Sequence, residues 1–329
     1  MKPKVLVTRI IPDEGLNLVR EKTEMDLWEG DLPPPHEVLL ERLKDKQGVV
    51  SLLTDRMDAA LMDANPQLKV ISNMAVGFDN IDIPAATQRG IPIGNTPGVL
   101  TDTTADFAFT LLMAAARRVV EGVDYVRAGK WKTWGPKLLM GQDVHGATLG
   151  IVGFGRIGQG MARRASGFDM RVIYYDVYRR PDLEASMGVT YADMDTLLRE
   201  SDFVTIHTDL NPETRHMFNA DAFHKMKRNA ILINTSRGPV VDPQALSDAL
   251  KAGEILAAAL DVTEPEPIPT DSRLLSLPNC LIVPHIASAS VTTRGKMAEM
   301  AARNLLAGLA GERLPTCVNP QVYDGKLRQ

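Results

Sequence analysis

Three polar residues in the second half of the chain have the side chains that one reaction would need. Arg237, Glu266 and His285 each come shortly after an apolar run typical of a strand. A histidine donates a proton near neutral pH, and a carboxylate beside it favours the charged imidazolium. An arginine holds a carboxylate with its planar fork. We therefore expect Arg237 to bind a substrate carboxylate while His285, beside Glu266, protonates a carbonyl oxygen that receives a hydride.

The positions of these residues depend on the strands and helices predicted around them. Apolar runs predict strands near residues 149–152, 171–175, 202–206, 230–234, 256–260 and 281–283. Helical patterns between them include residues 192–200, 220–226 and 243–252. Six strands with crossover helices predict a doubly wound parallel sheet, and ligands bind at the carboxyl edge of such a sheet. His207 also follows a predicted strand and is a rival proton donor, although no carboxylate comes after it at a comparable loop position.

A glycine-rich turn after the first of these strands predicts a dinucleotide site. The segment 148–160, TLGIVGFGRIGQG, joins an apolar run to a helical pattern through a G-x-G-x-x-G motif. The glycines permit a tight turn, close approach of a pyrophosphate and close packing of the helix on the strand. The N–H groups that begin the helix attract the phosphates. The predicted phosphate-binding residues are Gly153, Gly155, Arg156, Ile157 and Gly158.

Asp176 indicates which dinucleotide binds. It ends the next apolar run, 18 residues after Gly158, where an acid meets the adenosine ribose hydroxyls. A carboxylate repels a ribose 2′-phosphate, so NAD(H) is favoured over NADP(H). Arg179 and Arg180 keep NADP(H) possible, because an arginine there could pair with the extra phosphate.

The first half of the chain predicts a smaller α/β domain. Strands are expected near residues 5–7, 48–53, 68–72 and 91–93, and helices near 11–20 and 36–43. Strands that alternate with helices predict a parallel sheet covered on both faces. One long helix is expected from Thr103 to about Ala128, and a last helix from Thr293 to Gly308. The tail, residues 315–329, has little pattern.

Composition is that of a globular protein with room for two domains. The chain has 329 residues, of which 44% are hydrophobic and 24% charged, and its formal net charge is −4. This charge gives no electrostatic footprint for nucleic acid or an anionic membrane, and no apolar run is long enough to span a bilayer. The N-terminus is expected to be a strand and not a signal peptide. Cys280 and Cys317 suit neither a disulfide framework nor a metal cluster, so we expect a cytoplasmic protein without a metal.

Together the motifs resemble the D-isomer-specific 2-hydroxyacid dehydrogenases over nearly the whole chain. The motifs are TLGIVGFGRIGQG, the acid at Asp176, INTSRG, the D-x-x-E-x-E-P pattern from Asp261 to Pro267, and PHIASA. The resemblance implies an α/β protein with two doubly wound parallel-sheet domains and a cleft between them. The dinucleotide-binding Rossmann domain would comprise residues 100–289, and a discontinuous, flavodoxin-like substrate domain residues 1–99 and 290–329. It also implies a homodimer formed through the 101–145 region.

The resemblance further implies roles for single residues. Glu266 and His285 are similar to the family's acid–base pair, and Arg237 to its substrate-binding arginine. NMAVGFDNID resembles the substrate loop, in which the backbone of Val76 and Gly77 holds the carboxylate. Ser288 joins this substrate-binding set. The other cofactor-binding residues implied are Thr104, His207, Thr235, Ser236, Asp261 and His285.

Within the family, NTPGVLTDTTADFAF and the W-x-x-W-x-P segment are most similar to glyoxylate/hydroxypyruvate reductases. This implies reduction of a small 2-oxo acid to the 2-hydroxy acid with hydride from NAD(P)H. Dehydrogenases of D-lactate, phosphoglycerate or a sugar acid such as 2-ketogluconate are the alternatives within the family. A non-enzymatic, NAD-sensing corepressor on the same fold is the alternative from another class.

Overall fold

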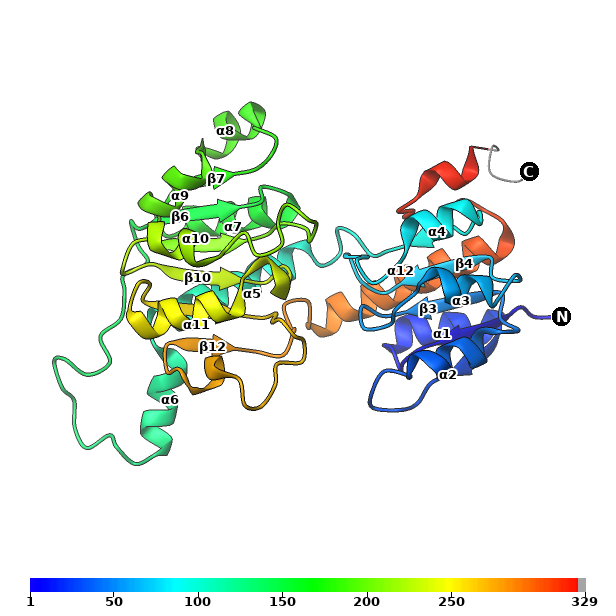
Figure 1. Ribbon diagram of the computed structural model, residues 1–329, viewed down its shortest axis with the longest axis horizontal. Helices are drawn as coiled ribbons and strands as arrows, with labels where there is room; N and C mark the ends of the chain where they lie inside the picture. The colour runs from blue at the N-terminus through cyan, green and yellow to red at the C-terminus, as the bar shows by residue number, and fades with distance from the viewer. Residues whose placement is uncertain (325–329) are drawn as a thin grey trace. The chain divides into compact units, whose positions relative to one another are not determined.

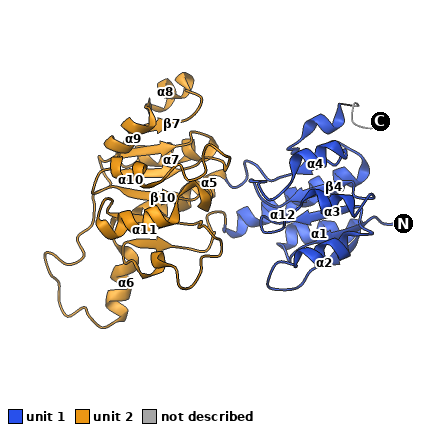
Figure 2. Cartoon of the chain, in the orientation of Figure 1, with its two compact units in different colours: residues 1–100, 289–329 blue, residues 101–288 orange. Residues whose placement is uncertain are grey.

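The computed structural model describes residues 1–324 and divides into two compact units. Unit 1 is Met1–Leu100 with Ala289–Gln329, and unit 2 is Thr101–Ser288 (Figures 1 and 2). Each unit is an α/β structure built on a parallel sheet, as the sequence predicts. No helix among the described residues has both the length and the apolar character needed to cross a membrane.

Unit 1 contains a five-stranded parallel sheet in the order β2-β1-β3-β4-β5. Its strands are β1 (Lys4–Val7), β2 (Glu24–Leu27), β3 (Gly48–Ser51), β4 (Val70–Asn73) and β5 (Ile93–Gly94). Four of them match predicted strands, and β2 was not predicted. The reason is that β2 is an edge strand of sequence EMDL with no fully buried residue, so it has no apolar run to identify it.

The helices of unit 1 cover this sheet, and the last of them returns from the far end of the chain. The helices are α1 (Asp13–Lys22), α2 (His36–Leu43), α3 (Ala59–Asp63), α4 (Ile83–Gln88), α12 (Val291–Ala310) and the 3₁₀ turn η3 (Pro320–Tyr323). A Cβ at Gly15 of α1 would collide with the backbone of Ala298 in α12, so glycine permits the close packing of these two helices. The short helices α3 and α4 were not predicted, and η3 lies in the tail whose last five residues are outside the described part.

Unit 2 contains a seven-stranded parallel sheet in the order β12-β11-β10-β9-β6-β7-β8. Its strands are β6 (Thr148–Val152), β7 (Arg171–Tyr175), β8 (Thr190–Tyr191), β9 (Phe203–Ile206), β10 (Ile231–Asn234), β11 (Ala257–Leu260) and β12 (Cys280–Ile282). All six predicted strands are present, and the two-residue edge strand β8 was not predicted. The doubly wound fold class is therefore confirmed.

The helices of unit 2 pack on both faces of its sheet. They are α5 (Thr101–Ala116), α6 (Val119–Arg127), α7 (Arg156–Ser166), α8 (Pro181–Met187), α9 (Met194–Glu200), α10 (Ala220–Lys225) and α11 (Pro243–Ala252), with 3₁₀ turns η1 (Gly238–Val240) and η2 (Arg273–Ser276). Alternate strand residues face opposite sides, so α5 and α7 cover one apolar face and α9, α10 and α11 the other. Both faces are thus buried, as a parallel sheet requires.

The prediction of one continuous helix from Thr103 to about Ala128 was wrong. Arg118 has a left-handed backbone conformation with φ 52°, which ends α5 and starts α6 in a new direction. The Arg118 side chain binds both carboxylate oxygens of Glu121, at 2.8 and 2.7 Å, and this pair helps to fix the break. Helix propensity alone gives no sign of such a local contact.

Candidate active site

Arg237 lies in a turn at the carboxyl end of β10 that Asn234 holds in place. The Oδ1 atom of Asn234 accepts hydrogen bonds from the N–H of Ser236, at 3.0 Å, and from its hydroxyl, at 2.8 Å. The Nδ2 atom donates to the carbonyl of Arg237 at 2.9 Å. Asn234 is fully buried, whereas Arg237 is only half-buried. The buried amide therefore fixes the backbone from which the guanidinium extends.

Asp261 follows β11 and holds the backbone that carries His285. Its carboxylate oxygens accept the N–H groups of Ile286, at 2.7 Å, and Ala287, at 2.8 Å. Its carbonyl accepts the N–H of His285 at 2.9 Å. Burial raises the pKa of Asp261, and the two N–H groups oppose that shift. The sequence suggested only a cofactor contact for Asp261, and it gave no sign that this residue anchors the loop after β12.

His285 and Glu266 form a close pair at this edge of the sheet. The imidazole Nδ1 lies 2.6 Å from Oε1 of Glu266, which is within hydrogen-bonding distance. The two side chains are 25% and 35% exposed, so a small molecule can reach them. His285 has a φ of 53°, which is uncommon for a residue other than glycine. Because Nδ1 faces the carboxylate, Nε2 is the nitrogen that remains to exchange a proton with a substrate.

Packing between adjacent loops brings the turn of Arg237 next to the loop of Glu266. A Cβ at Gly238 would collide with the carbonyl of Thr263, so these two backbones are in direct contact. Strands β10, β11 and β12 are parallel neighbours, and their carboxyl ends therefore meet at one edge. The three residues predicted from separate parts of the sequence thus follow neighbouring strands at the same edge of unit 2.

A second carboxylate in the same loop pairs with residues that the sequence did not identify. Glu264 binds Arg215, and its Oε2 lies 2.5 Å from Nε2 of His216. Both partners come from the loop after β9, so the contact joins that loop to the one carrying Glu266. Glu264 and His216 are 48 residues apart in the sequence, and no local pattern could have predicted their contact.

The structure makes His207 a poor rival to His285. Burial lowers the pKa of His207 to about 3, so its imidazole is neutral near pH 7. Its Nε2 lies 2.8 Å from the hydroxyl of Thr205. A neutral, hydrogen-bonded imidazole is not a source of the imidazolium proton.

The glycine-rich turn between β6 and α7 has the shape that a pyrophosphate needs. Gly153 has a φ of 93°, and a Cβ there would lie 2.6 Å from the carbonyl oxygen of His207. A Cβ at Gly158 would collide with the carbonyl of Gly153, so the helix starts in contact with the turn. At Gly155, by contrast, a Cβ would meet open space, so this glycine leaves a cradle beside the first N–H groups of α7.

Two unpaired hydroxyls also fit a bound dinucleotide at this edge. The Oγ1 atoms of Thr208, after β9, and Thr235, after β10, are buried and have no hydrogen-bond partner among the described residues. Buried polar atoms normally have a partner, so these two suit a polar ligand. Thr235 was predicted from the family resemblance, whereas Thr208 was missed because a threonine after a strand carries no distinctive motif.

Asp176 lies next to the glycine turn, as its spacing predicts. Its Oδ2 accepts the N–H of Phe154 at 2.7 Å, and its Oδ1 accepts the N–H of Tyr178 at 3.1 Å. The carboxylate is therefore fixed beside the turn, where it would meet the ribose hydroxyls. The residues present thus fit an adenine dinucleotide at the turn, at the acid and at the buried hydroxyls.

Both arginines that could favour a 2′-phosphate have acidic partners. Arg179 binds the two carboxylate oxygens of Glu184, each at 2.8 Å, and its guanidinium lies over the ring of Tyr191. Arg180 contacts Asp182 at 3.3 and 3.1 Å. These pairs reduce the positive charge that is available beside Asp176.

The remaining predicted residues lie in both units. Val76 and Gly77 are in the loop after β4 of unit 1, where both are half-buried. Thr104 is in the first turn of α5, and Ser288 ends unit 2. Among residues 1–324, no group of three or more histidine, cysteine, aspartate or glutamate side chains is placed to hold a metal ion.

The chain is similar to known proteins over almost its full length. Residues 109–287 match the NAD-binding domain of the D-isomer specific 2-hydroxyacid dehydrogenases. A glyoxylate reductase of Korarchaeum cryptofilum is 56% identical, with 98% of this chain and 97% of that protein covered. A crystal structure of a Thermus thermophilus protein has a TM-score of 0.91 at 47% identity, covering 96% and 99% of the two chains.

A further solved structure carries ligands. It is an NADPH-dependent glyoxylate/hydroxypyruvate reductase of Sinorhizobium meliloti in complex with NADP and malonate. This chain is 33% identical to it with a TM-score of 0.88, and the match covers 97% and 98% of the two chains. Sequence similarity over almost the full length, a shared fold and the site geometry lead to one conclusion. The chain belongs to the D-isomer specific 2-hydroxyacid dehydrogenases, a family of NAD(P)-dependent oxidoreductases.

Proposed function

We propose that this protein reduces glyoxylate or hydroxypyruvate to the corresponding 2-hydroxy acid. The observation that carries the proposal is the contact of 2.6 Å between His285 and Glu266, at the sheet edge that also carries Arg237 and the glycine turn. The names of the relatives at 47–56% identity support the same substrate class.

Each side chain has a distinct part in the proposed reaction. Arg237 and the backbone of Val76 and Gly77 hold the substrate carboxylate, and Ser288 joins this set. His285 donates a proton from Nε2 to the carbonyl oxygen, while Glu266 stabilises the imidazolium before the transfer. The nicotinamide cofactor, when bound, supplies the hydride. The proton donor and the carboxylate clamp thus neutralise the charge that develops on oxygen.

We assign the cofactor to residues at the carboxyl edge of unit 2. The proposed set is Thr104, Gly153, Gly155, Arg156, Ile157, Gly158, Asp176, His207, Thr235, Ser236, Asp261 and His285. NAD(H) is favoured because Asp176 stands beside the glycine turn, and NADP(H) stays possible because Arg179 and Arg180 follow it. The side chain of Asp261 already accepts two backbone N–H groups, so any contact to the cofactor would use its other lone pairs.

A substrate panel tests the proposal. Oxidation of NADH and NADPH is followed with glyoxylate, hydroxypyruvate, pyruvate, 3-phosphohydroxypyruvate and 2-ketogluconate. We expect the highest kcat/KM with glyoxylate or hydroxypyruvate. A higher kcat/KM with one of the other acids would move the assignment to another dehydrogenase of the family. No oxidation with any acid, together with normal NADH binding, would favour a corepressor-like binding protein.

A homodimer through the 101–145 region is part of the proposal. Figure 1 shows α6 and the chain after it standing away from the sheet of unit 2. Large apolar side chains are exposed along this segment, namely Val119, Val120, Val123, Val126, Trp131, Trp134, Leu138 and Met140. Monomeric proteins rarely expose so many together, so a second copy is the expected cover.

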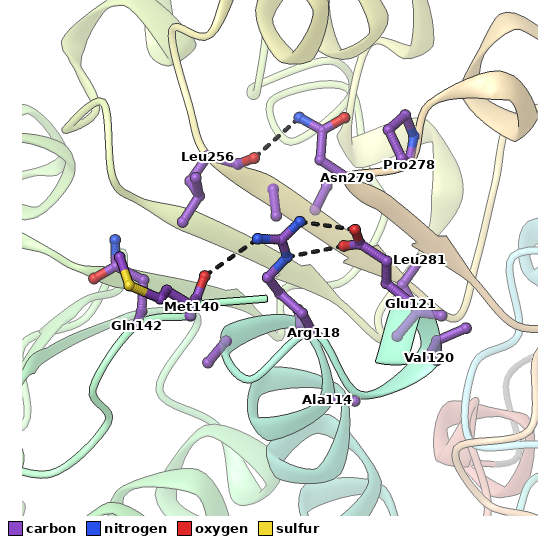
Figure 3. Close-up of a pocket in the computed structure, with 15 residues that line it drawn as sticks. Ala114, Arg118, Val120, Glu121, Met140, Gln142, Leu256, Pro278, Asn279 and Leu281 are labelled. Atoms are coloured by element: carbon purple, nitrogen blue, oxygen red, sulfur yellow. Dashed lines mark hydrogen bonds and ion pairs between the residues drawn. The ribbon is translucent and has the colours of Figure 1, made fainter. Parts of the chain in front are cut away.

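A cavity of about 440 Å³ adjoins the same segment. Figure 3 shows Arg118 held there by Glu121 and by the carbonyl of Met140, with Leu256 and Leu281 on the sheet side. The cavity therefore combines apolar walls with one anchored ion pair, which suits a protein partner. We also propose a reducing cytoplasm as the compartment, because two cysteines, Cys280 and Cys317, suit neither a disulfide framework nor a metal cluster.

A further inference from the structure

Three consecutive carbonyl groups in the loop after β4 are held by hydrogen bonds. The carbonyl of Ala75 accepts the N–H of Thr96 at 2.8 Å. The carbonyl of Val76 accepts from Nδ2 of Asn95 at 2.9 Å. The carbonyl of Gly77 accepts from Nδ2 of Asn73 at 3.0 Å. Two of the three donors are therefore asparagine amides. Asn73 ends β4, and Asn95 follows the neighbouring strand β5.

Fixing these carbonyls also fixes the N–H groups between them. In a trans peptide the C=O and N–H point in opposite directions. The bond from Thr96 to the carbonyl of Ala75 thus directs the N–H of Val76 away from Thr96, and the bond from Asn95 to the carbonyl of Val76 directs the N–H of Gly77 away from Asn95. Within residues 1–324 neither N–H donates to a protein acceptor, and both residues are half-buried. Successive N–H groups turned outward in this way form an anion-binding concavity.

The two asparagines are themselves held firmly. The carbonyl of Asn95 accepts from Nδ2 of Asn304, at 3.0 Å, and from the hydroxyl of Thr316, at 2.6 Å. Asn73 is fully buried, and its Oδ1 accepts from the hydroxyl of Ser51 at 3.1 Å. The backbone of Asn95 and the side chain of Asn73 are therefore held in place.

A third amide, that of Asn80, closes the far end of the loop. Asn80 accepts from Nδ2 of Asn73 at 3.2 Å, and its own Nδ2 donates to the carbonyls of Leu52 and Asp55, at 3.0 and 2.8 Å. The loop is thereby tied to the end of β3 as well as to β4 and β5. Its N–H groups keep their direction because both ends of the loop are anchored.

We propose that Asn95 is a positioning residue that aims the N–H of Gly77 at a small carboxylate, beside the N–H of Val76 that Thr96 orients. Asn73 holds the next peptide, between Gly77 and Phe78. The inference rests on the proposed function, since the carboxylate is that of the 2-oxo acid. Only a side chain that donates can serve here, because an aspartate would place an oxygen against a carbonyl oxygen. The amide of Asn95 acts through the backbone and does not touch the substrate.

The test compares substitutions that remove the hydrogen bond to the carbonyl of Val76 with one that leaves it intact. Asn95→Asp keeps the size of the side chain but removes the donor, and Asn95→Ala removes the whole amide. Asn319→Ala is the matched control, because Asn319 is another asparagine of unit 1 whose amide donates to a backbone carbonyl, that of Ile91 at 3.0 Å. The KM for glyoxylate, kcat and the Kd for NADH are measured, with the Kd for oxalate, a non-reacting dicarboxylate, in the presence of NADH.

We expect both Asn95 variants to raise KM and the oxalate Kd about tenfold, the size of effect that follows when hydrogen bonds to a charged group are weakened. The NADH Kd should stay unchanged, kcat should change less than KM, and Asn319→Ala should lower thermal stability without raising KM. Equal KM values in wild type, Asn95→Ala and Asn319→Ala would overturn the inference. Should Asn95→Ala fail to fold, Asn95→Asp gives the same comparison. Absence of 2-oxo acid reduction in the wild type would instead defeat the proposed function, and the oxalate Kd would still test the loop.

Discussion

His285 and Glu266 are 19 residues apart in the sequence, yet Nδ1 of the histidine lies 2.6 Å from Oε1 of the glutamate. Asp261 makes this contact possible, because its carboxylate takes two N–H groups of the loop after β12 and its carbonyl takes the N–H of His285. A buried acid that precedes both residues in the chain thus fixes the backbone that carries His285. This arrangement leads to predictions about the reaction, the cofactor and the stability of unit 2.

Replacing Glu266 by glutamine should slow catalysis without weakening cofactor binding. The amide keeps the shape of the side chain but removes the charge that favours the imidazolium, so kcat should fall about 10- to 100-fold. Steady-state kinetics and a fluorescence titration with NADH measure the two effects. Glu264→Gln is the matched control, since it makes the same change two residues away in a side chain that pairs with Arg215 and His216. Equal losses in both variants would contradict a specific role for Glu266.

Replacing Glu184 by glutamine should improve binding of NADPH relative to NADH. Arg179 loses its charged partner and becomes available to a 2′-phosphate, so the Kd for NADPH should fall severalfold while that for NADH stays constant. Glu200→Gln breaks a comparable exposed pair with Arg171 and serves as the control. Isothermal titration calorimetry with both nucleotides gives the ratio of the NADPH Kd to the NADH Kd. An unchanged ratio in Glu184→Gln would mean that Arg179 has no part in the choice of cofactor.

His207 should make unit 2 less stable in acid. Its pKa is lowered to about 3 by burial, whereas an unfolded histidine has a pKa of about 6.5. Between these values the unfolded state binds more protons, so the free energy of unfolding falls as pH decreases below about 6.5, by at most about 1.4 kcal/mol per pH unit.

The measurement is urea unfolding of wild type and His207→Gln at pH 7 and pH 5. The loss of stability between the two pH values should be smaller in the variant, by up to about 2 kcal/mol. His224→Gln, at an exposed histidine, should behave like wild type. The same acid dependence in all three proteins would show that His207 is not the titrating group.

The exposed apolar surface of α6 should be covered by a second copy of the chain. A charge at Val123 would be buried in such an interface, so Val123→Asp should shift the protein from dimer to monomer. Light scattering after size-exclusion chromatography measures the mass. Val177→Asp is the control. Val177 is an apolar residue of unit 2 that lies outside this segment and is 79% exposed. A wild type that runs as a monomer would end the dimer proposal.

The sequence allowed prediction of most of the fold because strong local patterns mark the long elements. Buried strands such as β10 read as apolar runs, and α11 matches its predicted bounds because Asp242 caps it and Gly253 ends it. The missed elements β2, β8, α3 and α4 are short or half-exposed and have no such pattern. The break at Arg118 depends on a contact that propensity does not describe.

The candidate site was predicted in part for the same reason. Parallel strands place their carboxyl ends together, so Arg237, Glu266 and His285 could be grouped from the amino-acid sequence alone. The anchoring role of Asp261, the pairing of Glu264 with His216 and the amides of Asn95 and Asn73 were not predicted. Each depends on a contact between residues from different loops, and such contacts leave no trace in local spacing.

Single-turnover reduction of glyoxylate by His285→Ala with bound NADH tests the central claim most directly. If His285 is the proton donor, the rate should fall about 10²- to 10⁴-fold, the usual contribution of a general acid. The Kd for NADH should change far less than the rate, because the glycine turn, Asp176 and Asp261 still bind the cofactor when the imidazole is removed. A rate close to that of wild type would show that another group protonates the substrate and would contradict the account.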